Sequence, residues 1–134
     1  MSALIYLAAT ANLIAAAFDC YSTIKHLSPN TELNPLASRL MKRLGMRPAV
    51  YLCYAVIVSV TLSVSAACLI VEASPMTALC ALALLLEATL HGMAAHVNTT
   101  GRFNRWTGFM LAPVVRVYSA WDRVWSRRGN KGER

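Results

Sequence analysis

The segment PAVYLCYAVIVSVTLSVSAACLIV, which runs from Pro48 to Val71, contains no charged residue. A helix needs ~20 predominantly apolar residues to cross ~30 Å of hydrocarbon, and this segment is long enough to do so. A predominantly apolar stretch from about residue 3 to 27 precedes it, and another from about residue 75 to 97 follows it. We therefore predict an all-α membrane protein with three transmembrane helices over these ranges.

The composition of the chain agrees with this prediction. Its 134 residues are 57% hydrophobic and 14% charged, whereas roughly a quarter of the residues in a typical soluble domain are charged. A soluble domain of this size has too little interior for so many apolar side chains. The formal net charge of +7 flanks the apolar stretches, which indicates contact with anionic lipid headgroups rather than with nucleic acid.

The basic residues predict an orientation. All 13 Lys and Arg residues lie in two blocks, Lys25–Arg47 and Arg102–Arg134, and the short connection Glu72–Ser74 carries none. Cytoplasmic loops of membrane proteins are enriched in Lys and Arg. We therefore expect the N-terminus outside and the C-terminus in the cytoplasm, with the chain in a bacterial inner membrane.

The chain is therefore predicted to consist of a three-helix transmembrane domain, residues 1–98, and a basic tail, residues 99–134. In the tail, apolar and aromatic residues recur at helical spacing on one face, and arginines share another face. The pattern predicts an amphipathic helix that lies on the cytoplasmic membrane surface, with a docking face for a partner protein as the alternative. The residues expected to anchor this helix are Arg105, Trp106, Arg116, Trp121, Arg123 and Trp125.

The connection between the first two spans contains the motif Glu32-Leu33-Asn34-Pro35. Leucines at helical spacing follow it, against basic residues on the other side, and Gly45 comes next. We predict a short interfacial helix that ends at Gly45, with Glu32 or Asn34 bonding its free backbone amides.

Polar residues occur within the first and third spans, where ionisable groups are costly and are functional candidates by default. Steps of seven residues place three of them on one face of the first span, and Glu87 and His91 lie one turn apart on the third. At ~1.5 Å per residue, Asp19 and His91 lie at similar depths and are expected to meet. The predicted buried polar cluster consists of Asn12, Asp19, Thr23, His26, Glu87 and His91.

Small residues recur at four-residue intervals in each span, and small residues let helices approach closely. We therefore predict that these faces lie in helix interfaces. The residues are Ala8, Asn12 and Ala16 in the first span, Ser59, Ser63 and Ala67 in the second, and Ala88 and Gly92 in the third.

The run NLIAAAFDCYST, from Asn12 to Thr23, is followed by ELNP from Glu32 to Pro35. Together they resemble the signature N-x6-D-x3-T, then E-x-N-P, of a family of small bacterial and archaeal integral membrane proteins of unknown function. The resemblance covers roughly residues 8–98 and implies a membrane protein without assigning it an activity. The signature of that family often includes a Lys in its second long span, and this chain has none there.

Three interpretations of function stay open. In the first, the polar cluster fixes the register of the helices in a scaffold or accessory membrane protein, which forms an oligomer or joins a larger membrane partner. In the second, it forms an intramembrane zinc or iron site, or the centre of a metalloenzyme. In the third, a polar stripe lines the lumen of a holin-like pore or of a transporter.

The candidate metal ligands are Asp19, His26, Glu32, His91 and His96. Glu87 and His91 are four residues apart, which differs from the E-x-x-H spacing of di-iron bundles, and no H-E-x-x-H motif occurs. No serine is clearly paired with a histidine and no G-x-S-x-G motif occurs. The sequence thus assigns no catalytic residue and predicts no cofactor, and it favours a protein that is not an enzyme.

Overall fold

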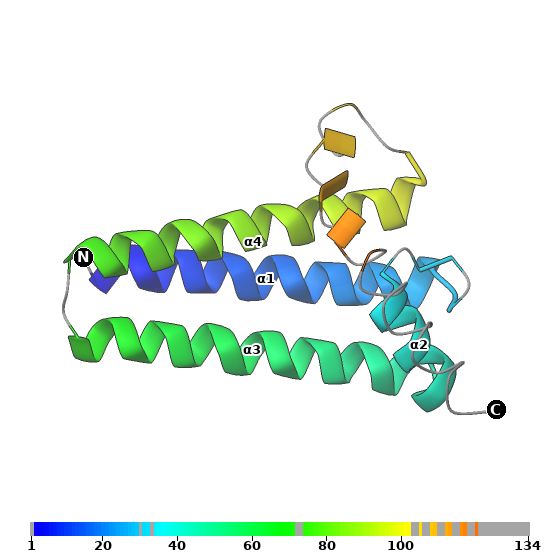
Figure 1. Cartoon of the computed structure of the whole chain (residues 1–134), viewed down its shortest axis with the longest axis horizontal. Coiled ribbons are helices and arrows are strands. Elements are labelled where there is room, and N and C mark those ends of the chain that lie inside the picture. Colours follow the sequence, from blue (N-terminus) through cyan, green and yellow to red (C-terminus); the bar gives the residue numbers. More distant parts are fainter. Residues whose placement is uncertain are drawn as a thin grey trace.

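The structure is a computed structural model that describes residues 2–29, 31–32, 34–71 and 74–102, together with positions 105, 108–109, 112–113, 116–117 and 120. The described chain is all-helical. Its helices are α1 (Ser2–His26), α2 (Pro35–Leu44), α3 (Met46–Val71) and α4 (Ser74–Thr100), as Figure 1 shows. The all-α prediction is therefore confirmed.

Three of these helices are long and apolar enough to cross a membrane, over Ala3–His26, Met46–Val71 and Pro75–Thr100. The predicted spans differ from them by a few residues. The third span, α4, continues past residue 97 because Asn98 still contacts α1. It ends where Gly101, at φ +66°, donates its backbone N–H to the Val97 carbonyl.

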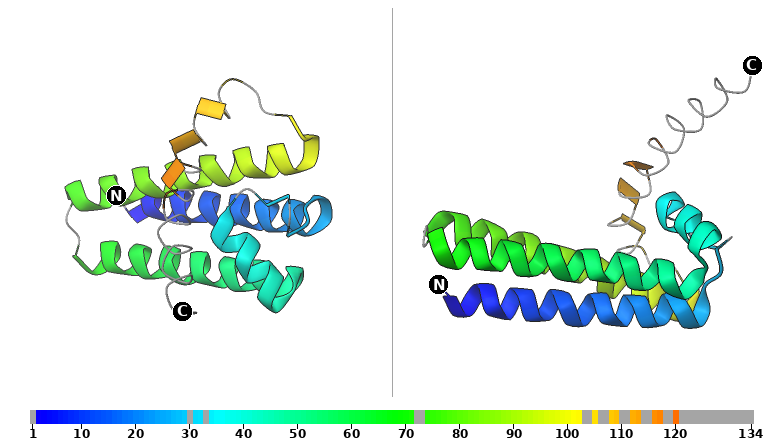
Figure 2. Two further views of the ribbon diagram at one scale, coloured as in Figure 1. Left: turned by 45° about the vertical axis from the view of Figure 1, so that its right-hand side comes forward. Right: turned by 90° about the horizontal axis from the view of Figure 1, so that it is seen from below.

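α1 packs against both α4 and α3, whereas α3 and α4 have few contacts with each other. Figure 1 shows why: α3 and α4 lie near each other at the end where Val71 and Ser74 lie, and they diverge toward α2. α2 packs against α3 at that far end, opposite the N-terminus (Figure 2). The three long helices are thus joined mainly through α1.

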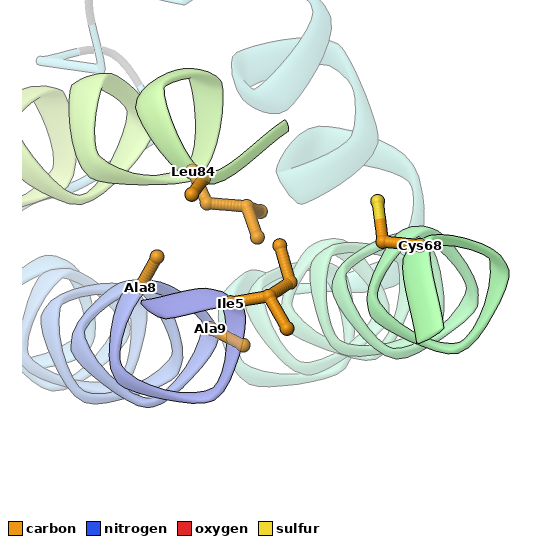
Figure 3. Packing of buried hydrophobic residues seen from close by; sticks show 6 residues of the cluster. Ile5, Ala8, Ala9, Cys68 and Leu84 are labelled. Carbon is orange, nitrogen blue, oxygen red and sulfur yellow. The ribbon is translucent and has the colours of Figure 1, made fainter. Parts of the chain in front are cut away.

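One of the two buried apolar clusters lies near the N-terminal end of α1, and the other lies between α2 and α3. In the first, Ile5, Ala8 and Ala9 of α1 pack with Cys68 of α3 and Leu84 of α4 (Figure 3). On their outer faces the helices present large apolar side chains, which suits a surface that faces lipid.

The predicted small stripe of α1 is confirmed, because Ala8, Asn12 and Ala16 are all 0% exposed. The predicted stripe of α3 is wrong, since Ser59, Ser63 and Ala67 are exposed. The face of α3 that is buried instead carries Thr61, Ser65 and Cys68. Hydroxyl-bearing and small residues occur on both faces of this helix, so their spacing alone could not select the one that packs. On α4, Ala88 is half-buried and Gly92 is exposed.

The structure shows the predicted capping of the short helix, and both polar residues take part. The Asn34 side chain accepts hydrogen bonds from the backbone amides of Leu36 (3.0 Å) and Ala37 (3.3 Å) and so caps α2. Glu32 Oε1 accepts one from the Asn34 backbone amide at 2.9 Å. These bonds satisfy amides that a helix start otherwise leaves without partners.

α2 ends at Gly45, whose φ of +87° and ψ of 160° suit glycine almost alone. We expect Gly45→Ala to lower the free energy of unfolding by about 1 kcal/mol through backbone strain. Gly92→Ala is the matched control: Gly92 is helical and a Cβ there meets no atom within 4 Å, so we expect a gain of about 0.5–1 kcal/mol. Unfolding in mixed micelles, followed by circular dichroism, measures both. Equal effects of the two changes would contradict this account of Gly45.

The predicted amphipathic tail falls largely outside the described residues. Trp106, Trp121, Arg123 and Trp125 lie there, whereas Arg105 and Arg116 are described as helical and exposed. The lipid-facing role of this segment therefore stays a prediction.

Candidate functional site

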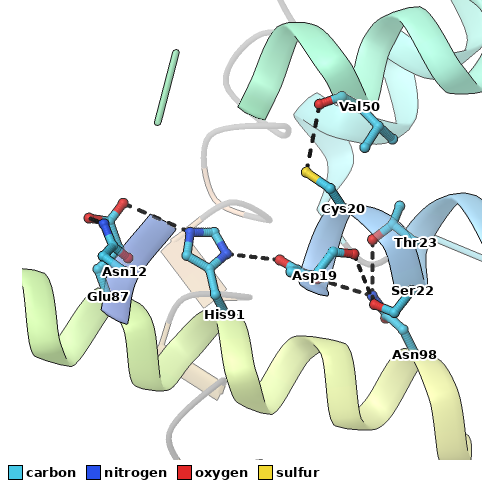
Figure 4. Close-up of polar contacts among 9 residues, drawn as sticks. All are labelled: Asn12, Asp19, Cys20, Ser22, Thr23, Val50, Glu87, His91 and Asn98. Atoms are coloured by element: carbon cyan, nitrogen blue, oxygen red, sulfur yellow. Dashed lines mark hydrogen bonds and ion pairs between the residues drawn. The ribbon is translucent and has the colours of Figure 1, made fainter. Parts of the chain in front are cut away.

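The polar residues of α1 and α4 meet along one interface between these two helices (Figure 4). α4 presents Glu87, His91 and Asn98, which follow one another by four and seven residues and therefore share a face. The strong packing of α1 against α4 brings this face to the polar stripe of α1.

Asp19 and His91 are at the centre of the cluster, as their equal depth predicts. His91 Nδ1 lies 2.9 Å from Asp19 Oδ2, which is hydrogen-bond distance. The Asp19 side chain is only 21% exposed, and the His91 side chain is only 18% exposed. When Nδ1 carries the ring proton, this N–H donates a hydrogen bond to the Asp19 carboxylate, and the hydrogen bond fixes the orientation of the ring.

Asn98 joins α4 to a full turn of α1. Its Nδ2 lies 3.2 Å from Asp19 Oδ1, 3.2 Å from Ser22 Oγ and 3.0 Å from Thr23 Oγ1. Ser22 Oγ in turn donates to the Asp19 backbone carbonyl at 2.9 Å. Asn98 and Ser22 are not part of the predicted cluster. The signal for Asn98 was its position seven residues after His91, on the same helix face.

Asn12 connects all three long helices. Its Nδ2 donates to Glu87 Oε2 of α4 at 2.9 Å and to Thr61 Oγ1 of α3 at 3.1 Å. Asn12 and Thr61 are both 0% exposed. Among the described residues, Asn12 Oδ1 has no hydrogen-bond partner. Thr61 was missed because α3 has hydroxyl residues on several faces.

Glu87 completes a row of ionisable groups. Its Oε1 lies 3.9 Å from His91 Nε2, and its side chain is 41% exposed. The imidazole of His91 therefore stands between two carboxyl groups, with Asp19 on its Nδ1 side and Glu87 on its Nε2 side.

His26 does not join the cluster, contrary to the prediction. It is exposed at the end of α1, and at this level Asn98 bonds to Ser22 and Thr23 instead. Residues at seven-residue steps drift by about 20° per step around a helix. Two steps from Asn12 are enough to turn the stripe away from its partner.

His96 lies on a different face of α4 from His91. It borders an open, mainly apolar groove of about 620 Å³ on the outer side of α1 and α4. Glu32 lies in the connection before α2 and bonds to Asn34. Of the five candidate metal ligands, only Asp19 and His91 are in contact. In the described part of the chain, no group of three or more His, Cys, Asp or Glu side chains is placed to hold a metal ion.

No protein-family model, curated protein or solved structure matches this chain. The likeness to the E-x-N-P signature therefore stays a resemblance. What the geometry offers chemically is a network of hydrogen bonds that joins three helices and contains two carboxyl groups and an imidazole.

Proposed function

We propose that this chain is a small integral membrane protein of the scaffold or accessory type, with a polar network that fixes the register of its spans. The observation that carries the proposal is the pair of asparagine side chains that bond across helix interfaces. Asn12 bonds to α3 and α4, and Asn98 bonds to α1. Polar side chains of this kind hold helices together in membranes, where lipid provides no hydrophobic force between them.

The topology is part of the proposal. With the N-terminus outside and the C-terminus in the cytoplasm of a bacterial cell, α2 and both basic blocks lie at the cytoplasmic surface, beside anionic lipid headgroups. Arg39, Lys42 and Arg43 of α2 are exposed, while Met41 is buried against Ala49 and Val50 of α3. A basic face held at one end of the bundle supports this orientation.

The accessory role follows from how little of each span is covered. In the most apolar window of each span, 28% of α1, 17% of α3 and 11% of α4 is buried within the chain. The remaining apolar surface is available to lipid, to a second copy of the chain or to a larger membrane partner.

The proposal is tested by elemental analysis of detergent-purified protein together with its oligomeric mass. We expect no stoichiometric zinc or iron, and we expect Asp19→Asn to reduce stability in metal-free buffer. Stoichiometric metal that is lost in Asp19→Asn or His91→Ala would refute the structural role and favour a metal site.

A separate prediction concerns orientation. In intact cells, a membrane-impermeant maleimide is expected to label Ala3→Cys, whose position is exposed near the N-terminus, but to label Thr31→Cys only after permeabilisation. The parent chain is the baseline, because its four free cysteines all lie within the long helices. The reverse pattern would invert the proposed topology.

A further inference from the structure

We propose that Glu87, His91 and Asp19 form a proton-binding relay inside the helix bundle, in which His91 exchanges a proton with a carboxyl group on either side. The ligand is the proton itself. This inference goes beyond a scaffold role and rests on the proposed insertion of α1, α3 and α4 in a membrane.

The geometry places the imidazole in line between two proton acceptors. Asp19 Oδ2 is 2.9 Å from Nδ1, and Glu87 Oε1 is 3.9 Å from Nε2. A neutral imidazole donates from one nitrogen and accepts on the other, so it can take up a proton on one side and release one on the other. The Glu87 contact is longer than a hydrogen bond. A small rotation of this half-exposed side chain must close it before transfer.

In each carboxyl group, one oxygen accepts a hydrogen bond from an asparagine amide and the other oxygen is directed toward His91. Asn98 Nδ2 donates to Asp19 Oδ1, which leaves Oδ2 as the oxygen that bonds to His91. Asn12 Nδ2 donates to Glu87 Oε2, which leaves Oε1 as the oxygen that can carry a proton toward His91. The proposed relay has two states, and in the first of them Glu87 is protonated at Oε1, His91 carries its proton on Nδ1, and Asp19 is ionised.

One relay step moves two protons and leaves the number of protons in the group unchanged. The O–H bond at Glu87 Oε1 breaks as an N–H bond forms at His91 Nε2. The N–H bond at Nδ1 breaks as an O–H bond forms at Asp19 Oδ2. Glu87 is then ionised, Asp19 is neutral, and His91 is neutral with its proton on Nε2. The charge of the group is unchanged, and the net result is a proton displaced from Glu87 to Asp19.

A proton bound to this group limits the negative charge inside the bundle. With both carboxyl groups ionised and His91 neutral, two negative charges would lie inside the bundle, which is costly at low dielectric. The chain has no Lys or Arg from residue 48 to 101. Lys25, at the end of α1, bonds to the Tyr21 hydroxyl on the exposed side of the helix.

The packed helices carry other titratable groups as well. Of these, His96 borders the outer groove rather than the cluster. Cys20 faces the Val50 carbonyl of α3. Together with Lys25, these groups are Tyr6, Cys20, Tyr21 and His26 on α1, Arg47, Tyr51, Cys53, Tyr54 and Cys68 on α3, and Cys80 and His96 on α4.

The relay is closed on the side of Asn12. Asn12 and Thr61 are fully buried beside Glu87, and beyond them lies the apolar cluster of Ile5, Ala8 and Leu84. Glu87, His91 and Asp19 themselves keep partial exposure. The buried apolar cluster separates the relay from the N-terminal end of α1, so the group binds a proton without forming a route across the bundle.

The test is the ¹⁵N spectrum of the full-length chain with labelled histidine, because ¹⁵N shifts distinguish a protonated ring nitrogen from a bare one. In the wild type, we expect both ring nitrogens of His91 to show shifts averaged between the two forms. In Glu87→Gln, this averaging should be lost, with the proton fixed on Nδ1 against Asp19. In Asp19→Asn, the preference for Nδ1 should be lost.

His26 and His96 should keep their spectra in both variants, and His96→Gln should leave the His91 signals unchanged. Circular dichroism and a monodisperse micelle show that each variant is folded. A wild-type His91 with one fixed protonated nitrogen overturns the relay even if both variants fail to fold. So does a spectrum that Glu87→Gln leaves unchanged. Neither result bears on the scaffold role, which metal content and topology test separately.

Discussion

Asp19→Ala is expected to lower the free energy of unfolding by about 2–3 kcal/mol. The change removes both carboxylate oxygens, so His91 Nδ1 loses its acceptor and Asn98 Nδ2 loses one of three. An interhelical hydrogen bond in a membrane protein contributes only about 0.6 kcal/mol on average. Leaving a buried donor without a partner costs about 1–3 kcal/mol more. Because the Asp19 and His91 side chains are both partly exposed, we expect the total loss of stability to lie at the lower end of what breaking a buried ion pair costs.

The measurement is reversible unfolding in mixed detergent micelles, with helicity as the signal. Thr10→Ala is the matched control, since Thr10 is an exposed polar residue of the same helix, and we expect a change within about 0.5 kcal/mol. The double variant Asp19→Ala with Asn98→Ala should cost less than the sum of the single changes, because the two residues bond to each other. Additive effects, or a result equal to that of Thr10→Ala, would show that the network does not stabilise the fold.

Periodicity and depth were enough to predict the centre of the cluster. Seven-residue steps in α1 and a four-residue step in α4 define one face on each helix, and the rise per residue matches Asp19 with His91. The capping of α2 was also predictable, because Asn and Pro at a helix start have a local role that needs no tertiary information.

The contacts with α3 were not predictable in this way. Four hydroxyl residues, Ser59, Thr61, Ser63 and Ser65, alternate along α3, and only Thr61 and Ser65 are buried. Which pair faces α1 depends on the rotation of α3 about its own axis. That rotation is set by tertiary contacts such as the one between Thr61 and Asn12, and local sequence does not determine it.

α1 is therefore the helix on which the others depend. It carries small residues for close approach and polar residues for bonding on one face, and α3 and α4 contact each other little. A change on the buried face of α1 must disturb both interfaces, whereas a similar change on α3 matters only on the sides that meet α1 and α2. This asymmetry sets the second large expected effect.

Ala16→Leu is expected to lower the free energy of unfolding by about 2 kcal/mol, because added methylene groups in a packed interface force side chains and backbone to shift. Ala16 is 0% exposed and lies one turn after Asn12 and just before Asp19 on α1. Forcing the helices apart here also stretches the bonds from His91 and Asn98 to Asp19. The His91 ¹⁵N signals should therefore change together with the stability.

Ala67→Leu on α3 is the matched control, since Ala67 is exposed, and it should change stability by less than about 0.5 kcal/mol. The same unfolding measurement in mixed micelles compares the stabilities of these two variants. A neutral Ala16→Leu with a destabilising Ala67→Leu would mean that α3 packs through Ser59, Ser63 and Ala67 after all. In that case Thr61 would point away from α1, and Asn12 would lose its bond to α3. The three-helix network would then reduce to a contact between α1 and α4 alone.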